Sequence, residues 1–313
     1  MMSKIATRDA YGRALARLGA EKADVVVLDA DLAKSTKTID FAKVYPERFF
    51  DMGIAEQNLM GTAAGLAAIG KIPFASTFAM FATGRAFEQI RNSIAYPKLN
   101  VKIAATHAGI TVGEDGASHQ TVEDIALMRV LPNMTVLAPA DGPETEGAIR
   151  WAAEHTGPVY IRLGRLAVPV INEENYVFTP GKAVTLRQGK DVTIIATGLM
   201  VSVALEAAEA LAAEGIGAEV LNIHTIKPID AEAILASTAR TGCVVTAEEH
   251  SVIGGLGSAV AEVLVEGQPV PMERVGLKDT FGESGKPAEL LKKYGLTAEA
   301  VVAAARRSME RKR

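Results

Sequence analysis

Short apolar runs alternate along the chain with longer stretches of helical period. Runs rich in Val, Ile and Leu predict buried strands at residues 24–28, 101–105, 135–138 and 159–162. Between them the apolar spacing predicts helices near residues 7–19, 55–69, 83–94, 122–129 and 143–154. Strands and helices that alternate in this way form a mostly parallel sheet covered by helices. Residues 1–165 are therefore predicted to form one α/β domain.

A second domain is predicted after a short connection. Residues 166–190 lack a helical period and contain Pro169, Pro180 and Gly181, which is typical of an interdomain linker. The following repeat predicts strands at 191–197, 218–222 and 243–248, and helices at 201–214, 231–238 and 255–266. The expected fold class is α/β with two domains, 1–165 and 191–313, each built on a mostly parallel sheet.

Composition narrows the function classes. With 313 residues, 49% hydrophobic and 22% charged, the chain has the balance of an ordinary globular protein with room for two cores. A net charge of -4 gives no strong positive field, so nucleic acid is not an expected partner. The single cysteine, Cys243, excludes an internal disulfide. No signal-peptide core or membrane-spanning apolar run is present, so the cytoplasm is the expected location.

One carboxylate stands out from its apolar surroundings. The segment DMGIAEQNLMG, residues 51–61, places Glu56 among apolar and small residues. Glu56 falls in the first turn of a predicted helix, where the helix dipole favours the ionised form by roughly 0.3–1 kcal/mol. Burial would oppose this and would favour sharing a proton with a ligand. The alternative is an ordinary first-turn acid that faces water.

Two further segments carry candidate chemistry. Phe78 and Phe81 are spaced to share a helical face, which would offer an aromatic platform or, alternatively, a plain core pair. The glycine-rich segment 106–120 follows a predicted strand, where open α/β sheets bind ligands. It would present His107, Asp115 and His119 to a polyhydroxylated substrate, or it is a surface turn.

Together these segments resemble the pyrimidine-binding domain of the transketolase family, whose enzymes use thiamine diphosphate. The resemblance implies that Glu56 hydrogen-bonds the aminopyrimidine ring of the cofactor and helps it to lose its thiazolium proton. It also implies that Phe78 and Phe81 form the ring pocket and that Asp31 lines the cofactor end of the site.

The same resemblance assigns the substrate end of the site. The family positions that bind a sugar phosphate correspond to Arg8, Ser35, His107 and Arg165, with Arg162 as a rival to Arg165. Arginine suits this task because its planar fork binds phosphate oxygens two at a time. The catalytic residues implied are Glu56, His107 and His119, and the substrate-binding residues are Arg8, Ser35, His107, Asp115, His119 and Arg165.

A missing motif suggests that the site is shared with another chain. Transketolases hold the diphosphate through a metal ion bound at a Gly-Asp-Gly motif in their N-terminal domain, and this sequence contains no such motif. The chain thus resembles the C-terminal subunit of a split, two-gene transketolase. This implies an N-terminal partner subunit that holds Mg²⁺ or Ca²⁺, an α2β2 assembly, and transfer of a two-carbon ketol unit from a ketose phosphate to an aldose phosphate.

The same segments are compatible with other functions. A 1-deoxyxylulose-5-phosphate synthase and the beta subunit of a 2-oxo acid dehydrogenase share the glutamate of the transketolases. A non-catalytic module that kept the fold and lost the chemistry is a further alternative.

Overall fold

The first sheet is built almost wholly from the N-terminal half of the chain. The structure, a computed structural model, describes residues 3–312. The strands of this sheet are β2 (Val25–Asp29), β3 (Phe49–Asp51), β4 (Ile72–Ser76), β5 (Lys102–Ala105), β6 (Thr135–Leu137), β7 (Val159–Arg162) and β12 (Thr225–Lys227). Their order is β12-β6-β7-β5-β4-β2-β3, and all neighbours are parallel except β12 and β6.

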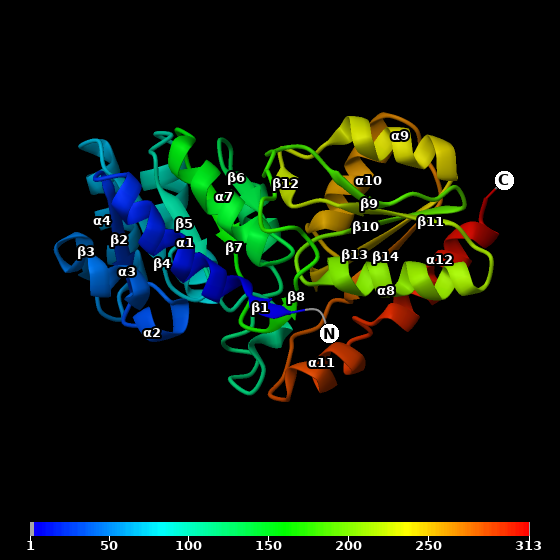
Figure 1. Cartoon of the computed structure of the whole chain (residues 1–313), viewed down its shortest axis with the longest axis horizontal. Coiled ribbons are helices and arrows are strands. Elements are labelled where there is room, and N and C mark those ends of the chain that lie inside the picture. Colours follow the sequence, from blue (N-terminus) through cyan, green and yellow to red (C-terminus); the bar gives the residue numbers. More distant parts are fainter. Residues whose placement is uncertain (1–2, 313) are drawn as a thin grey trace.

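Helices cover both faces of this sheet (Figure 1). They are α1 (Thr7–Glu21), α2 (Ala33–Thr36), α3 (Ile39–Val44), α4 (Glu56–Ala68), α5 (Phe87–Gln89), α6 (Asp124–Arg129) and α7 (Gly142–Glu154). On one face Leu15 of α1 and Ile149 of α7 pack with Phe74 of the sheet. On the other face Leu59 of α4 and Ile125 of α6 are buried in a separate cluster. Burial on both faces explains the continuous apolar runs of the strands.

The second sheet has five strands in the order β14-β13-β10-β11-β9. These are β9 (Val184–Arg187), β10 (Val192–Ala196), β11 (Ala218–Asn222), β13 (Val244–Ser251) and β14 (Met272–Leu277). Its helices are α8 (Met200–Ala213), α9 (Ala231–Thr241), α10 (Leu256–Glu266), α11 (Pro287–Lys293) and α12 (Ala298–Glu310). Only β9 runs antiparallel to its neighbour. The predicted fold class, α/β with two mostly parallel sheets, is confirmed.

The two halves are joined by more than one connection. β1 (Lys4–Ala6) pairs with β8 (Ala167–Pro169), and β12 crosses from the second half to pair with β6. The core around the first sheet also includes Ile226 and Leu256 from the second half. The segment 166–190 therefore contains two strands, β8 and β9, although the domain boundary placed there stays a prediction. Residues 1, 2 and 313 of the predicted domains lie outside the described range.

Local structure departs from the sequence-based expectations in several elements, among them one helix and strand β4. The helix expected near residues 83–94 is instead α5 flanked by two π-helical segments, Phe81–Arg85 and Ile90–Ala95. Strand β4 was not predicted because Pro73, Ala75 and Ser76 weaken its apolar pattern. Pro73 is tolerated because pairing with β5 begins only at the next residue. Within residues 3–312, no helix is both long and apolar enough to cross a bilayer.

Candidate functional site

The predicted site residues gather at one edge of the first sheet. Strands β7, β5, β4 and β2 are neighbours and parallel, so their carboxyl ends lie together. Asp31 follows β2, Phe78 follows β4, His107 follows β5 and Arg165 follows β7. This edge is where open α/β sheets normally bind ligands.

Glu56 is buried at the start of α4 but is not surrounded by apolar groups alone. Its side chain is 2% exposed, and its Oε2 accepts a hydrogen bond of 2.8 Å from Arg85 Nη1. The Arg85 guanidinium also lies over the Phe81 ring, 4.5 Å from its centroid. The expectation of wholly apolar surroundings was wrong, because the cation comes from a segment 29 residues away along the chain.

Aromatic rings form a stack beside this carboxylate. Phe78 and Phe81 are nearly parallel, at an interplanar angle of 10° and a centroid distance of 5.9 Å. The other side of the stack is His107, whose ring lies 3.8 Å from Phe78. His119 meets the Phe81 ring edge-on at 5.2 Å. The two phenylalanines do not share a helical face as expected, because Phe78 lies before the helical segment, in a bridge to Thr106.

The carboxylate and the rings fit an aminopyrimidine. A single guanidinium, that of Arg85, contacts both Glu56 and Phe81, so a flat ring of similar reach could contact the same two groups. The buried carboxylate would exchange a proton or hydrogen bond with a ring nitrogen, and Phe81 would provide a face for stacking. The fit concerns only the pyrimidine end of the cofactor. Within residues 3–312, no three His, Cys, Asp or Glu side chains converge in a way that could hold a metal ion.

His107 is held in one tautomer by its neighbours. Arg8 Nη1 lies 3.0 Å from His107 Nε2, and Thr106 Oγ1 lies 2.8 Å from Nδ1. Because arginine only donates, Nε2 must accept and Nδ1 carries the proton. Burial, and after it the charges of Arg8 and Arg165, lower the pKa of His107 to about 3. A neutral His107 is thus fixed beside two cations.

Of the two rival arginines, Arg165 faces the site. Its side chain is 37% exposed, and Nη1 donates to Asp115 Oδ2 at 3.4 Å. Arg162 is only 8% exposed and binds Asp124 at 2.8 Å. Arg8 and Arg165 are close enough for each charge to matter, since Arg165 contributes, after burial, to lowering the pKa of Arg8. Two neighbouring guanidiniums and a neutral imidazole would attract an anionic group.

The loop after β2 is organised by a residue that the sequence reasoning missed. Asp29 is fully buried and accepts hydrogen bonds from Leu32 N at 2.6 Å and Thr36 Oγ1 at 2.7 Å. This loop places the carbonyl of Ser35 where Arg8 Nη1 donates to it at 3.1 Å. Asp31 is exposed in the same loop with a φ of 61°. Ser35 therefore contacts Arg8 through its backbone.

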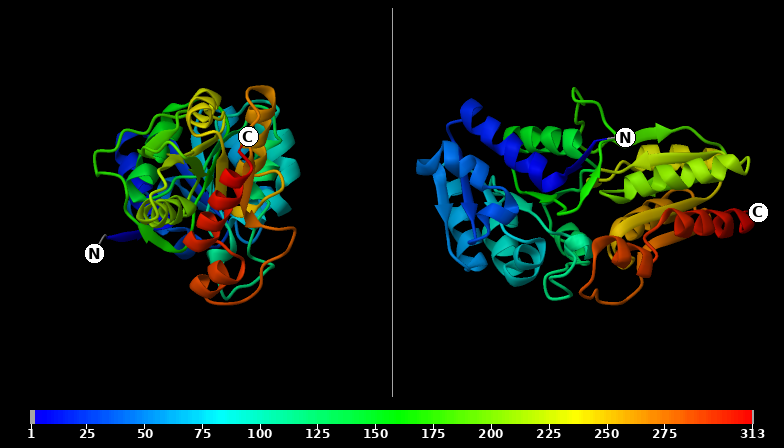
Figure 2. Two further views of the ribbon diagram at one scale, coloured as in Figure 1. Left: turned by 90° about the vertical axis from the view of Figure 1, so that its right-hand side faces the viewer. Right: turned by 60° about the horizontal axis from the view of Figure 1, so that its bottom comes forward.

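The second half of the chain supports the loop that carries His107 and His119. Glu249 of β13 is 3% exposed, and its Oε1 accepts a hydrogen bond of 2.7 Å from Thr111 N. A Cβ at Gly109 would lie 2.1 Å from the Glu249 carboxyl carbon, so only glycine permits this approach. Gln120 Nε2 donates to Glu283 O at 2.9 Å, which ties the loop to the segment before α11 (Figure 2).

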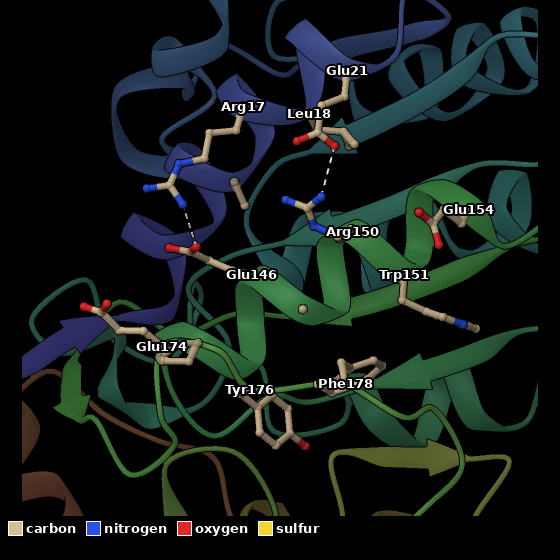
Figure 3. Close-up of a pocket in the computed structure, with 14 residues that line it drawn as sticks. Arg17, Leu18, Glu21, Glu146, Arg150, Trp151, Glu154, Glu174, Tyr176 and Phe178 are labelled. Carbon is tan, nitrogen blue, oxygen red and sulfur yellow. Dashed lines mark hydrogen bonds and ion pairs between the residues drawn. The ribbon is translucent and has the colours of Figure 1, made fainter.

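The groove between α1 and α7 is lined by none of the predicted site residues. It has a volume of about 460 Å³ (Figure 3), and its arginines are already paired, Arg17 with Glu146 and Arg150 with Glu21. The glycines before α10 form no phosphate loop, because Glu248 accepts the hydrogen bonds of the first backbone N–H groups of that helix. The edge of the first sheet remains the candidate site.

Comparison with known families agrees with this geometry. The family model described as transketolase, pyrimidine binding domain, matches residues 3–170, and the model described as transketolase, C-terminal domain, matches residues 181–301. The chain belongs to the transketolase family. The predicted resemblance to the C-terminal subunit of a split transketolase, with these two domains, is confirmed. Relatives that match this chain over nearly their whole length are themselves described as a transketolase C-terminal section and a split gene transketolase.

Three such transketolase relatives illustrate the match. The chain is 56% identical over 306 residues to a transketolase C-terminal section from Methanocaldococcus jannaschii, covering 97% of this chain and 95% of that one. It is 50% identical over 305 residues to a 6-deoxy-6-sulfo-D-fructose transketolase subunit from Clostridium sp., with the same coverage of 97% and 95%. A solved structure described as a split gene transketolase, inactive beta4 tetramer, has a TM-score of 0.93 and 64% identity, covering 99% of this chain and 100% of that chain.

Proposed function

We propose that this chain is the C-terminal subunit of a thiamine-diphosphate-dependent transketolase, which transfers a two-carbon ketol unit between sugar phosphates together with an N-terminal subunit. The observation that carries the proposal is the buried Glu56 carboxylate beside the stacked rings of Phe78 and Phe81. An anion-attracting group of Arg8, His107 and Arg165 lies at the same edge of the sheet. Family membership supports the reaction class.

Each part of the site has a task in this proposal. Thiamine diphosphate, when bound, would supply a carbon nucleophile for the ketose carbonyl and an electron sink for the electron pair of the carbon–carbon bond that breaks. Glu56 holds the proton or hydrogen bond at the pyrimidine ring, and the phenylalanine stack orients that ring and excludes water. His107 and His119 border the same stack, from where their nitrogens can donate to or accept from sugar hydroxyls.

The charged end of the substrate would lie near Arg8 and Arg165. These guanidiniums would bind the terminal phosphate, with Ser35, Asp115 and the histidines around it. A relative at 50% identity is described as acting on a sulfonated sugar, and its sulfonate is an anion as well. This supports a ketose with an anionic terminal group as the donor.

A partner subunit would complete the site. We propose that it holds Mg²⁺ or Ca²⁺ and the diphosphate, and that two copies of each chain form an α2β2 assembly. The relative described as an inactive tetramer of beta chains supports this view. The outer face of α4 offers a surface for association, because Gly61 and Gly65 face open space within the described residues, and Ile54 and Ile69 are 76% and 75% exposed. The cytoplasmic location stays a prediction.

A turnover assay of the reconstituted complex tests the reaction. The two chains would be mixed with thiamine diphosphate and Mg²⁺ and given either xylulose 5-phosphate with ribose 5-phosphate, or pyruvate with glyceraldehyde 3-phosphate. We expect turnover of the first pair. Turnover of the second pair alone would show a synthase, and turnover of neither by a complex that binds the cofactor would point to a different substrate or to a non-catalytic module.

The role of Glu56 has its own test. We expect Glu56→Gln to lower kcat of the reconstituted complex by about 10²-fold or more, since positioned acids and bases contribute on that scale. Glu88→Gln is a matched control, because Glu88 of α5 is exposed and, among residues 3–312, its side chain bonds only to Gln89 and Asn92. Equal turnover of Glu56→Gln and Glu88→Gln would refute the assigned role.

A further inference from the structure

Arg85 contacts both Glu56 and Phe81, the two side chains that a cofactor ring would contact in the proposed site. Its Nη1 donates to Glu56 Oε2 at 2.8 Å, while its guanidinium carbon lies 4.5 Å from the centroid of Phe81. Glu56 is 2% exposed, whereas the Arg85 side chain is 48% exposed. The arginine thus closes the buried carboxylate from the solvent side.

The local backbone places Arg85 there. Arg85 ends the π-helical segment Phe81–Arg85, in which the wider turn changes the direction of the side chains that follow. Gly84 belongs to the same turn, and Met80 packs against it so closely that a Cβ on Gly84 would lie 2.3 Å from Met80 Cε. Such π-helical turns recur at functional sites.

We propose that Arg85 is a displaceable cover of the cofactor-ring pocket, which pairs with Glu56 and stacks on Phe81 in the free chain and leaves both when the ring of thiamine diphosphate is seated. This rests on the proposed function. The cover keeps a buried carboxylate from standing alone before assembly, which would otherwise be costly. It also imposes a competition, because Arg85 and the ring require the same ring face and the same carboxylate.

The competition has a size and a sign. A half-exposed ion pair and an exposed cation–π contact are both weak, and together they change an equilibrium constant by about threefold to thirtyfold. Removing the competitor should therefore tighten cofactor binding by about threefold to thirtyfold. If Arg85 instead helped to hold the cofactor, its removal would weaken binding.

The test is calorimetric titration of thiamine diphosphate with Mg²⁺ into the reconstituted complex of the full chain and its N-terminal subunit. We expect Arg85→Ala to lower Kd by about threefold to thirtyfold, and Arg85→Gln, which keeps a hydrogen-bond donor without the charge, to lie between Arg85→Ala and the native protein. Arg91→Ala is the matched control, because Arg91 is exposed on the next π-helical segment and, in the described part of the chain, its side chain bonds only to Asn92.

The outcomes separate this inference from the function on which it rests. A Kd for Arg85→Ala that is unchanged, or raised, overturns the cover while thiamine diphosphate binding itself stands. Absence of binding by the native complex and by every variant overturns the proposed function and the cover together. Thermal unfolding of the chains alone confirms that Arg85→Ala is folded, and Arg85→Gln decides the matter if the alanine variant is not.

Discussion

Glu249 offers a test of how the second half of the chain holds the candidate site. Burial raises the pKa of its carboxyl from 4.5 to about 7, although the nearby Arg162 and the hydrogen bond from Thr111 act in the opposite direction. Arg162 is a weak counterion for this group, because its guanidinium binds Asp124 at 2.8 Å but lies 3.9 Å from Glu249 Oε2. The substitution Glu249→Gln removes the titration and keeps an oxygen that can accept from Thr111 N.

The sign of the effect follows from proton binding. Between pH 4.5 and about pH 7 the folded chain retains a proton on Glu249 that the unfolded chain has released. The contribution of Glu249 to the free energy of unfolding of the wild-type chain is therefore fully present below pH 4.5 and is lost as pH rises through 7. A rise of this size in pKa corresponds to about 3 kcal/mol. Relative to wild type, Glu249→Gln should thus gain about 3 kcal/mol between pH 4.5 and 8.

Urea unfolding of the chain alone, followed by Trp151 fluorescence at several pH values, measures this difference. Glu266→Gln is the control, because Glu266 is exposed at the end of α10. A second variant, Glu249→Ala, should lose about 1–3 kcal/mol at pH 5, because Thr111 N–H then has no acceptor. A stability difference between Glu249→Gln and wild type that stays constant with pH, or shrinks as pH rises, would refute the reasoning.

Three further predictions concern the site and the packing. The NMR signal of the His107 C2 proton should not shift between pH 5 and 8, because the imidazole stays neutral in the folded chain. As pH falls from 6.5 towards 3, only the unfolded chain protonates this imidazole and the native protein loses stability, so the His107→Asn variant should lose less stability over the same range. Arg8→Ala and Arg165→Ala should each raise KM of the reconstituted complex for a phosphorylated donor by about tenfold, and an unchanged KM would contradict the phosphate site. Gly19→Ala should destabilise the chain by about 1–2 kcal/mol, since overpacking outweighs helix propensity, whereas Gly65→Ala should stabilise it slightly. The reason is that a Cβ at Gly19 would lie 2.4 Å from the Tyr45 ring, whereas one at Gly65 would meet nothing within the described residues. A urea midpoint for Gly19→Ala that lies above that of Gly65→Ala would contradict this packing.

The sequence predicted what depends on local pattern. Buried strands such as β2 and β11 have continuous apolar runs in the sequence, and the glycine-rich segment 106–120 after a predicted strand pointed to the sheet edge at which the candidate residues lie. Glu56 could be singled out because a carboxylate in an apolar segment is unusual.

What could not be predicted depends on long-range contacts and on backbone detail. Arg85 reaches Glu56 only because a π-helical turn redirects it, and an arginine in a polar helix face gives no such signal. The loop of His107 is held by Glu249, which lies in the other half of the chain, 138 residues beyond its partner Thr111. Strand β12 joins the first sheet from the second half, which a local apolar pattern cannot reveal.

The most direct test of the split site is calorimetry of thiamine diphosphate with Mg²⁺, titrated first into this chain alone and then into its mixture with a candidate N-terminal transketolase subunit. We expect binding only in the mixture, because in the proposed split site this chain would hold the pyrimidine end of the cofactor and the N-terminal subunit its diphosphate end. Tight binding to the single chain, or no binding to a mixture that assembles, would contradict it.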